Sequence, residues 1–305
     1  MTLMMNAVAL GITLAYASVA GAASTATVSQ TGAGGNDAYV EQAGNTGSSV
    51  AITQEGSNRI GEAAGAKHGV QQESSIKSSI AIQQYNMASA TVKQLVVDTG
   101  SIQLGQTGTS LQATIEQNKG SHLLVDAIQS GASHALDLQQ YNVNDGRQAA
   151  SQLAEGNRAK LVQINSSGVR ATLEQTGNSA DALIVQDNVV NSSVTTKQQG
   201  LDNRAYIDQR DGTDLIVNAN QSSGPQLLNV YQSGTLSTVT ADQSGSWNEA
   251  RLLQAGTNNT INLTQVGSGT DLATRNIANI DQSGSNLTAN LTQNGARQIA
   301  AIKQR

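Results

Sequence analysis

The sequence predicts an all-β fold, a two-sided β-solenoid of about 12 stacked strand-turn-strand coils with roughly 23 residues in each coil. Three observations support this prediction. Glutamine returns at a nearly constant interval, the residues before each of these glutamines alternate between apolar and polar, and a turn-forming residue follows shortly after. A short, constant period is typical of one small structural unit stacked many times, and it argues against a globule with a central pocket.

The repeating glutamines form two interleaved series with steps of 22 or 23 residues. Each interval between neighbouring glutamines therefore holds one strand and one turn. The first series comprises Gln94, Gln117, Gln140, Gln163, Gln186, Gln209, Gln232 and Gln254. The second series comprises Gln106, Gln129, Gln152, Gln175, Gln198, Gln221, Gln243 and Gln265.

Each glutamine closes a stretch in which apolar and polar side chains alternate. Before Gln94, for example, Ala90 and Val92 are apolar, whereas Thr91 and Lys93 are polar. Alternation with a period of two indicates a strand with one buried face and one solvated face. We therefore expect the apolar residues and the glutamine to point into the column, and the charged and hydroxyl side chains to face water.

Turn-forming residues follow the glutamines at a fixed distance. The second residue after the glutamine is most often glycine, as at Gly32, Gly108 and Gly177, and otherwise often Asn or Asp. These residues tolerate a positive φ and suit a tight reversal of the chain. Two intervals are longer than the rest, and we expect their extra residues to form loops near 57–65 and 268–275, where an insertion disturbs no strand.

A glutamine that points into the column needs hydrogen-bond partners. Equivalent residues of neighbouring coils lie about 4.7–4.8 Å apart, as in amyloid, so each amide N–H can reach the amide oxygen of the next glutamine. Each such bond contributes roughly 0.5–1.5 kcal/mol net, whereas an unpaired buried amide costs about 1–3 kcal/mol. We expect both series to form structural ladders that fix the register of an amyloid-like solenoid.

The composition excludes several classes of protein. The chain has 305 residues but no Phe, no Cys, one Trp and one Pro. Without Cys there are no disulfides and no Cys-based metal sites. The net charge of −5 is small and the 17 basic residues are scattered, which gives no basic patch for nucleic acid. We expect no catalytic residues, no metal and no cofactor.

The N-terminus has the pattern of an export signal. Residues 7–20 are an apolar run that is too short to span a membrane, and small residues follow it. The first six residues lack Lys and Arg, which is unusual for a signal and leaves the true start Met open. We predict a signal peptide at 1–22 and the solenoid over 23–305.

Both ends of the predicted column show the ordinary repeat and no capping element. The first strand carries Val28 and Gln30, and the last carries Ile302 and Gln304. A strand with unpaired N–H and C=O groups can pair with another chain. We expect these four residues to mark edges at which copies of the protein assemble.

Two complete copies of a longer motif occur in the C-terminal part of the chain. The first consists of Gln243, Gly245, Asn248, Ala250 and Gln254. The second consists of Gln254, Gly256, Asn259, Ile261 and Gln265. Partial copies run from Gln30 to Gln304. This motif resembles the curlin repeat of the bacterial curli functional amyloid, and the resemblance covers nearly all of residues 23–305.

The resemblance implies a secreted subunit that polymerises with itself into an extracellular cross-β fibre, or fimbrium, for biofilm matrix and adhesion. It also implies a companion curlin or nucleator subunit, a periplasmic chaperone and an outer-membrane secretion channel. The chain departs from the family pattern, because it has more repeats and lacks the motif Asn at Ala180, Leu215 and Leu287. Its basic end, at Lys303 and Arg305, resembles the minor, nucleating subunit, so the major and minor types are alternatives.

Other functions find less support in the sequence. His68, His122 and His134 fall at different places in the repeat and lack ligand spacing. Residues 34–37 resemble part of a calcium-binding repeat, but that pattern occurs once and favours a turn. A polysaccharide-acting enzyme would need a groove of clustered carboxylates, Arg or aromatics, and an ice-binding solenoid would need uninterrupted rows of Thr. A monomeric secreted adhesin or binding solenoid is the main alternative to a fibre subunit.

Overall fold

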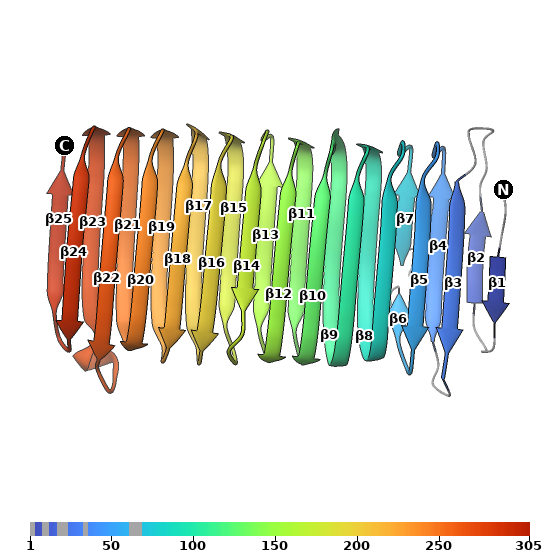
Figure 1. Ribbon diagram of the computed structural model, residues 1–305, viewed down its shortest axis with the longest axis horizontal. Coiled ribbons are helices and arrows are strands. Elements are labelled where there is room, and N and C mark those ends of the chain that lie inside the picture. The colour runs from blue at the N-terminus through green and yellow to red at the C-terminus, as the bar shows by residue number, and fades with distance from the viewer. Residues whose placement is uncertain (1–3, 8–11, 17–23, 33–35, 61–68) are drawn as a thin grey trace. The chain divides into compact units, whose positions relative to one another are not determined.

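A computed structural model describes residues 4–7, 12–16, 24–32, 36–60 and 69–305 of the chain. The chain divides into two compact units, Met1–Gln152 and Leu153–Arg305. Both are parallel β-solenoids, and together they comprise about 12 turns of about 23 residues. The predicted all-β solenoid is therefore confirmed. Within each unit, successive coils lie side by side as long, narrow hairpins (Figure 1).

In the first unit the strands form two stacks, which we call sheets 1A and 1B. Sheet 1A contains β3, β5, β10 and the start of β12, and sheet 1B contains β4, β6, β7 and β11. The long strands β8 and β9 run through both sheets. The bounds are β1 Met4–Ala7, β2 Ile12–Tyr16, β3 Thr25–Thr31, β4 Asp37–Ala43, β5 Ser49–Glu55, β6 Arg59–Ile60, β7 Val70–Glu73, β8 Ser79–Asp98, β9 Ser101–Ser121, β10 Leu124–Ala132, β11 Ala135–Asn144 and β12 Arg147–Glu155.

In the second unit the strands alternate between sheets 2A and 2B. Sheet 2A contains β14, β16, β18, β20, β22 and β24, and sheet 2B contains β13, β15, β17, β19, β21, β23 and β25. The bounds are β13 Arg158–Ile164, β14 Arg170–Gln175, β15 Asp181–Val190, β16 Ser193–Gly200, β17 Asn203–Thr213, β18 Ile216–Ser223, β19 Gln226–Thr235, β20 Thr238–Ser246, β21 Asn248–Thr257, β22 Thr260–Ser268, β23 Asn276–Ser285, β24 Thr288–Gly295 and β25 Ile299–Gln304.

Parallel pairing keeps equivalent residues in register from coil to coil. From β13 to β23, each strand of the second unit pairs with the strand two ahead, so that Gln186 lies opposite Gln209 and Gln198 lies opposite Gln221. Inward and outward residues alternate along each strand, as in β14, where Ala171, Leu173 and Gln175 are buried. The core is therefore a narrow layer between two sheets, filled by small and medium aliphatic side chains and closed along one side by glutamines.

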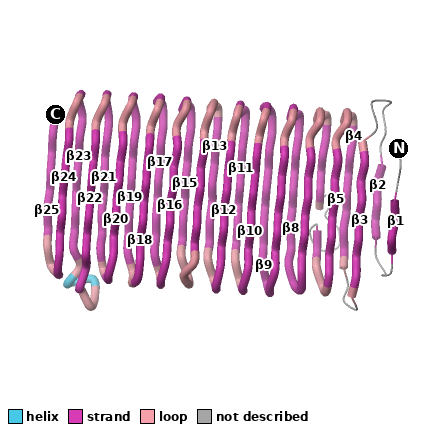
Figure 2. Tube along the Cα trace, viewed as in Figure 1, coloured by secondary structure: helices cyan, strands magenta, loops and turns pink. Residues whose placement is uncertain are grey.

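The corners of the coils demand residues that accept a positive φ. Gly108 has φ +144°, and the non-glycine residues at such corners are mostly Asn, Asp and Ser, including Asn142 and Asp211. These residues reach the left-handed region at low cost. Figure 2 shows these corners as short loops between straight strands.

The two longer intervals differ in what the structure describes. Of the loop expected near 57–65, residues 59–60 form the short strand β6, and residues 61–65 belong to the range 61–68 that lies outside the described residues. Residues 269–275 run between β22 and β23 and contain the 3₁₀ turn η1, Leu272–Thr274 (Figure 2). The Asp271 side chain caps this turn by accepting the backbone N–H groups of Ala273 and Thr274, both at 2.9 Å. Arg275 Nε lies 2.7 Å from Glu249 Oε2 and holds the loop to β21.

Most of the predicted signal peptide lies outside the described residues. The parts that are described, β1 and β2, pair in parallel with β3 and β4. Among the residues that the structure describes, no helix is long and apolar enough to cross a membrane.

Candidate functional site: glutamine ladders and open strand edges

The predicted glutamines of the second unit form two continuous rows of side-chain hydrogen bonds. In sheet 2B, each Nε2 donates to the Oε1 of the next glutamine along Gln163, Gln186, Gln209, Gln232, Gln254, Gln282 and Gln304 at 2.7–3.0 Å. In sheet 2A, the row runs through Gln175, Gln198, Gln221, Gln243, Gln265 and Gln293 at 2.6–2.9 Å.

The first unit contains two rows of the same kind. In sheet 1A the row runs through Gln30, Gln54, Gln84, Gln106, Gln129 and Gln152 at 2.7–2.9 Å. In sheet 1B it runs through Gln42, Gln72, Gln94, Gln117 and Gln140 at 2.7–2.9 Å.

The same amides also tie the two sheets of a unit together. Gln198 Nε2 donates to the backbone oxygen of Asp181 at 3.1 Å, and Gln221 Nε2 donates to that of Arg204 at 2.9 Å. These acceptor oxygens lie near the start of strands in the opposite sheet. One glutamine amide therefore bonds both to the next glutamine of its own sheet and to the backbone of the opposite sheet. Because these side chains are fully buried, each of the two amide N–H groups needs an acceptor. The next glutamine Oε1 and the backbone oxygen are these two acceptors.

Every ladder bond points the same way, from the lower-numbered glutamine to the higher-numbered one. At the N-terminal end of the sheet 1A row, Gln30 Oε1 is buried and has no hydrogen-bond partner, and Gln30 is 1% exposed. At the other end, Gln304 Nε2 donates to Thr288 O at 3.0 Å and has a second N–H to offer. The N-terminal end thus presents an acceptor and the C-terminal end a donor.

The motif asparagines form clamps at the corners. Asn248 Nδ2 donates to Ser244 O at 2.7 Å, and its Oδ1 accepts from Asn276 Nδ2 at 3.2 Å. Asn259 Nδ2 donates to Ala255 O at 2.9 Å, and its Oδ1 accepts from the backbone N–H of Leu287 at 3.0 Å. Each clamp therefore closes its own turn and holds the next coil.

The motif glycines precede these clamps and have positive φ, +77° at Gly245 and +108° at Gly256. A Cβ at Gly256 would lie 1.9 Å from the carbonyl oxygen of Gly284, one coil further along. Glycine is therefore required at this corner both by its conformation and by the closeness of the coils.

Serines at other corners also bond both to their own turn and to the next coil, a role that the sequence analysis did not predict. Ser237 Oγ donates to Thr235 O at 3.0 Å and accepts from the backbone N–H of Asn259 at 3.3 Å. Ser192 makes the equivalent bonds to Val190 and Leu215. The recurrence of Ser at corners that lack Asn is a signal that could have identified them.

The two predicted assembly edges differ in the structure. At the N-terminal edge, Val28 and Gln30 are buried, and β1 lies along β3 with Ala7 opposite Gln30. This edge is open only in a chain from which residues 4–7 have moved away or been removed. At the C-terminal edge, β25 pairs with β23 and, among the described residues, with no other strand.

Among the described residues, the open edge at the C-terminal end comprises two strands, one from each sheet, which enlarges the predicted set. β24, with Leu291 and Gln293, is bonded only to β22 in the described chain, so it is as open as β25. Ile302 is half-buried, whereas its counterpart Ile280 one coil earlier is 1% exposed. The last coil thus presents apolar side chains that an inner coil would cover.

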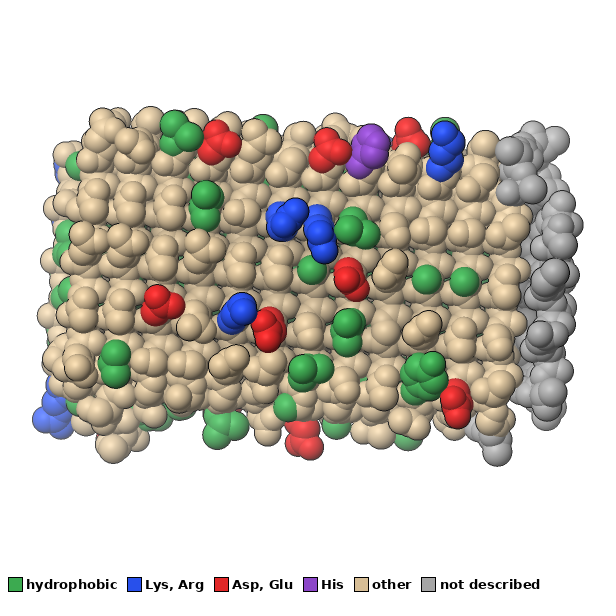
Figure 3. Space-filling view, in the orientation of Figure 1, with side chains coloured by type: hydrophobic (Ala, Val, Ile, Leu, Met, Phe, Trp, Pro, Cys, Tyr) green, Lys and Arg blue, Asp and Glu red, His purple; other side chains and the backbone are tan. Residues whose placement is uncertain are grey.

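The outer faces carry scattered polar and charged groups. Figure 3 shows a face on which most side chains are neither charged nor hydrophobic. Elsewhere, a hydrogen bond of 2.7 Å from Arg210 Nε to Asp208 raises the pKa of the guanidinium, and burial together with a hydrogen bond to Glu116 raises the pKa of the Tyr141 phenol. The first contact lies within β17 and the second joins β11 to β9 in the neighbouring coil. Exposed ion pairs such as the first stabilise little.

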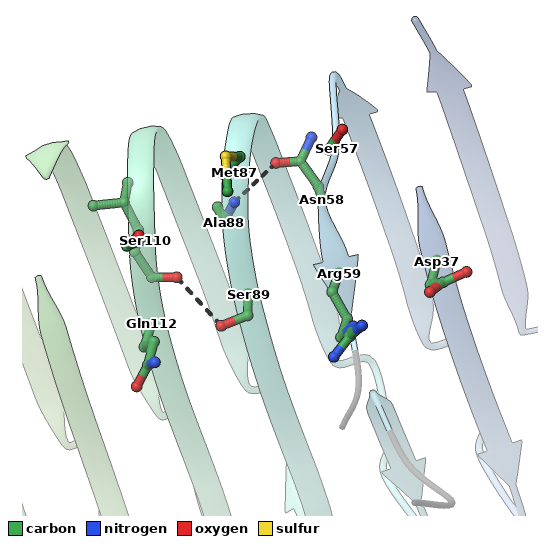
Figure 4. Close-up of a pocket in the computed structure, with 10 residues that line it drawn as sticks. Asp37, Ser57, Asn58, Arg59, Met87, Ala88, Ser89, Ser110 and Gln112 are labelled. Atoms are coloured by element: carbon green, nitrogen blue, oxygen red, sulfur yellow. Dashed lines mark hydrogen bonds between the residues drawn. The ribbon is translucent and has the colours of Figure 1, made fainter. Parts of the chain in front are cut away.

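A hollow in the first unit lies beside the corner at Asn58 (Figure 4). Asp37 and Arg59 lie opposite each other in the sheet along its wall, and Asn58 Oδ1 accepts the backbone N–H of Ala88 at 3.2 Å. Ser89 Oγ donates to the backbone oxygen of Leu111 at 3.3 Å. The polar groups here serve the corner itself, and no nucleophile is paired with a base among the residues drawn in Figure 4.

The histidines lie apart. His134 is buried, with Nε2 3.1 Å from Ser130 O, whereas His122 is exposed and lies 3.4 Å from Asp145. His68 and residues 34 and 35 lie outside the described residues. Within the part of the chain that the structure describes, no group of three His, Cys, Asp or Glu side chains could hold a metal ion.

Residues 234–267, which span the two complete motifs, match the family model described as the curlin associated repeat. The chain thus contains a curlin repeat. No curated protein matches its sequence. The matched curlin repeats contain the ladder residues Gln243, Gln254 and Gln265 together with the clamps at Asn248 and Asn259. A curlin repeat on a β-solenoid points to a structural, non-enzymatic protein.

Proposed function

We propose that this curlin-repeat protein is the structural subunit of an extracellular, curli-like amyloid fibre that serves biofilm matrix and adhesion. The observation that carries the proposal is the ladder that stays in register and ends at strand edges with unsatisfied groups. A continuous row of amides is favourable only when each member has neighbours on both sides. A further copy supplies the missing neighbour, as in cross-β stacks.

The proposal includes secretion after removal of residues 1–22. By likeness to the family, it also includes a companion curlin or nucleator subunit, a periplasmic chaperone and an outer-membrane channel as partners. The basic pair Lys303 and Arg305 at the open end favours a nucleating role as a variant of the same function, because such an end attracts acidic side chains of another subunit.

A seeded-growth assay tests the proposal. Purified protein should convert from soluble to fibrillar after a lag that preformed seeds abolish. Fibre diffraction should show reflections near 4.7 and 10 Å, the strand and sheet spacings. A stable monomer that seeds leave unchanged would instead favour a secreted adhesin or binding solenoid. The same assay with a companion curlin as seed distinguishes a bulk subunit from a nucleator.

A further inference from the structure

We infer that the outward face of β20, β22 and β24 binds the surface of ice crystals. This inference does not depend on the proposed function, because it concerns the side of the column and not its ends. The outward side chains of the three strands form a grid of three columns and three rows. The eight neutral members of the grid, which we call the threonine face, are Thr238, Thr240, Thr260, Asn262, Thr264, Thr288, Asn290 and Thr292.

The register of the three strands makes the threonine face regular. Thr260 lies opposite both Thr238 and Thr288, and no register shift interrupts either pairing over the described length of the strands. Neighbouring strands lie about 4.8 Å apart, and outward residues follow one another at about 6.6 Å along a strand. Both periods are close to repeats of the oxygen lattice of ice. Liquid water has no fixed spacing, so such regularity favours a crystalline partner.

The side chains of this face are neutral and can hydrogen-bond with water in either direction. A threonine hydroxyl both donates and accepts, and the methyl group beside it restricts the orientation of nearby water. Of the nine grid positions, all of which the structure describes, only Asp242 is charged. Glu174 and Lys197, which interrupt the rows of Thr elsewhere, lie in β14 and β16. Figure 3 shows this face, and few charged side chains lie on it toward the C-terminal end.

The grid is fixed before any ice arrives. Behind it, Gln243 donates to Gln265 at 2.8 Å and Gln265 donates to Gln293 at 2.6 Å, which holds the three strands at one spacing. On the face itself, Asn262 Nδ2 donates to Asn290 Oδ1 at 2.9 Å. Threonine is β-branched and therefore stiff at χ1. The face thus loses little conformational freedom when it meets a rigid lattice.

The opposite face of the same coils has a different character. On β21 and β23 of sheet 2B, outward positions hold Glu249, Arg251, Leu253 and Asp281. Both faces share the spacing of the repeat, but charged and apolar side chains fill this one. The composition of the threonine face is therefore not a by-product of the repeat, and sheet 2B supplies matched control positions.

A crystalline polysaccharide is another rigid, periodic surface that a flat polar face could meet. Sugar rings are commonly held by stacking on aromatic side chains. None of the outward residues of β20, β22 and β24, all of which the structure describes, is aromatic. The absence of a stacking surface from these strands favours ice as the partner.

Two matched lysine substitutions test the face. Asn262→Lys places a charge at the centre of the grid, whereas Asn279→Lys places the same charge on the opposite face, in β23. Both positions are exposed, so both variants should fold, as circular dichroism can check. Freshly purified, full-length wild type should separate the melting and freezing temperatures of ice and suppress its recrystallisation. Asn262→Lys should reduce this thermal hysteresis at least fivefold, and Asn279→Lys should leave it unchanged.

A gain of activity separates the inference from any loss of folding. Asp242→Thr completes the grid and removes its charge, so it should raise the thermal hysteresis at least twofold at equal protein concentration. Asp281→Thr makes the same exchange on the opposite face, where the residue also directly precedes a ladder glutamine, and should have no effect.

Three results would overturn the inference. The first is wild-type protein that suppresses recrystallisation no better than an inert protein of equal mass concentration. The second is equal hysteresis in the two lysine variants, and the third is no gain in Asp242→Thr. Binding to crystalline cellulose that Asn262→Lys abolishes, together with unaffected ice growth, would assign the face to a glycan instead. These measurements use soluble protein, so a failure to form fibres would contradict the proposed function alone.

Discussion

A buried glutamine is the unit from which this column is made. Its amide can donate twice and accept, and in the inner coils Gln209 donates to Gln232 Oε1 and to Ser193 O while it accepts from Gln186. A side chain with fewer hydrogen-bonding groups would leave the glutamines on both sides of it without a partner. The ladder is therefore sensitive to interruption in its middle and less sensitive at its end.

Gln209→Ala should destabilise the second unit strongly. It removes the partners of Gln186 Nε2 and Gln232 Oε1, and each unpaired buried group costs about 1–3 kcal/mol. Gln304→Ala interrupts the row at an exposed end, where water can replace the lost partner, and should cost less. Urea unfolding followed by the fluorescence of Trp247, the one tryptophan, compares them. Equal losses in the two variants would contradict a register-fixing ladder.

At Thr196 the buried apolar pattern contains a polar exception. It lies between Leu173 and Ala219 in adjacent strands, is fully buried, and its Oγ1 has no hydrogen-bond partner. Thr196→Val should raise the free energy of unfolding by about 1–3 kcal/mol, because a methyl group replaces a desolvated hydroxyl of nearly the same shape. Thr195→Val, on the outward face of the same strand, should change it by less than about 0.5 kcal/mol. A loss of stability in Thr196→Val would indicate that the hydroxyl does have a partner.

At the scale of the element, strand and corner impose different demands. The strands tolerate many aliphatic residues, since Ala, Val, Ile and Leu all occupy inward positions. The corners allow less choice, because the chain must take a positive φ while the next coil lies directly beside it. Substitutions at different corner glycines can therefore distinguish the cost of conformational strain from the cost of crowding between coils.

Gly256→Ala and Gly295→Ala should differ although their φ angles, +108° and +117°, are similar. A Cβ at Gly256 would meet Gly284 O at 1.9 Å, whereas a Cβ at Gly295 would have only Gln298 Nε2 nearby, at 3.6 Å. We expect Gly256→Ala to lower the unfolding midpoint far more than Gly295→Ala, as circular dichroism can measure. Similar midpoints would mean that φ strain alone decides the cost and that the coils can separate to admit a methyl group.

At the scale of the whole molecule, charge acts on encounters between copies. The chain carries a net charge of −5 at pH 7 and has an isoelectric point near 5.1. If copies polymerise, elongation of seeds should be several-fold faster near pH 5 than at pH 7, because the repulsion between chains vanishes. Added salt should reduce this difference by screening, with a Debye length of about 3 Å at 1 M. A slower rate near pH 5 at low salt would contradict this expectation.

The repeat predicted the fold almost completely, because register in a parallel stack follows directly from sequence spacing. The sequence did not reveal the sense in which the amides point, since a glutamine can donate in either direction along the column. It also did not reveal that Ser192 and Ser237 replace asparagine as corner clamps, because serine is common at outward positions as well. β24 is open as well as β25 because each strand pairs with the strand two positions later in the chain. This pairing is a property of the whole coil and cannot be read from one strand.

The shared direction of the amide rows has an electrical consequence. A peptide-type amide carries a dipole of about 3.5 D. In the strands the backbone dipoles largely cancel, but the side-chain amides of each row are aligned and their dipoles add. Within the second unit, two such rows run in the same sense, which makes the end at Gln293 and Gln304 the positive pole. The unit thus carries a net dipole along its glutamine rows. The field of this dipole can orient an approaching charged molecule before any strand touches it.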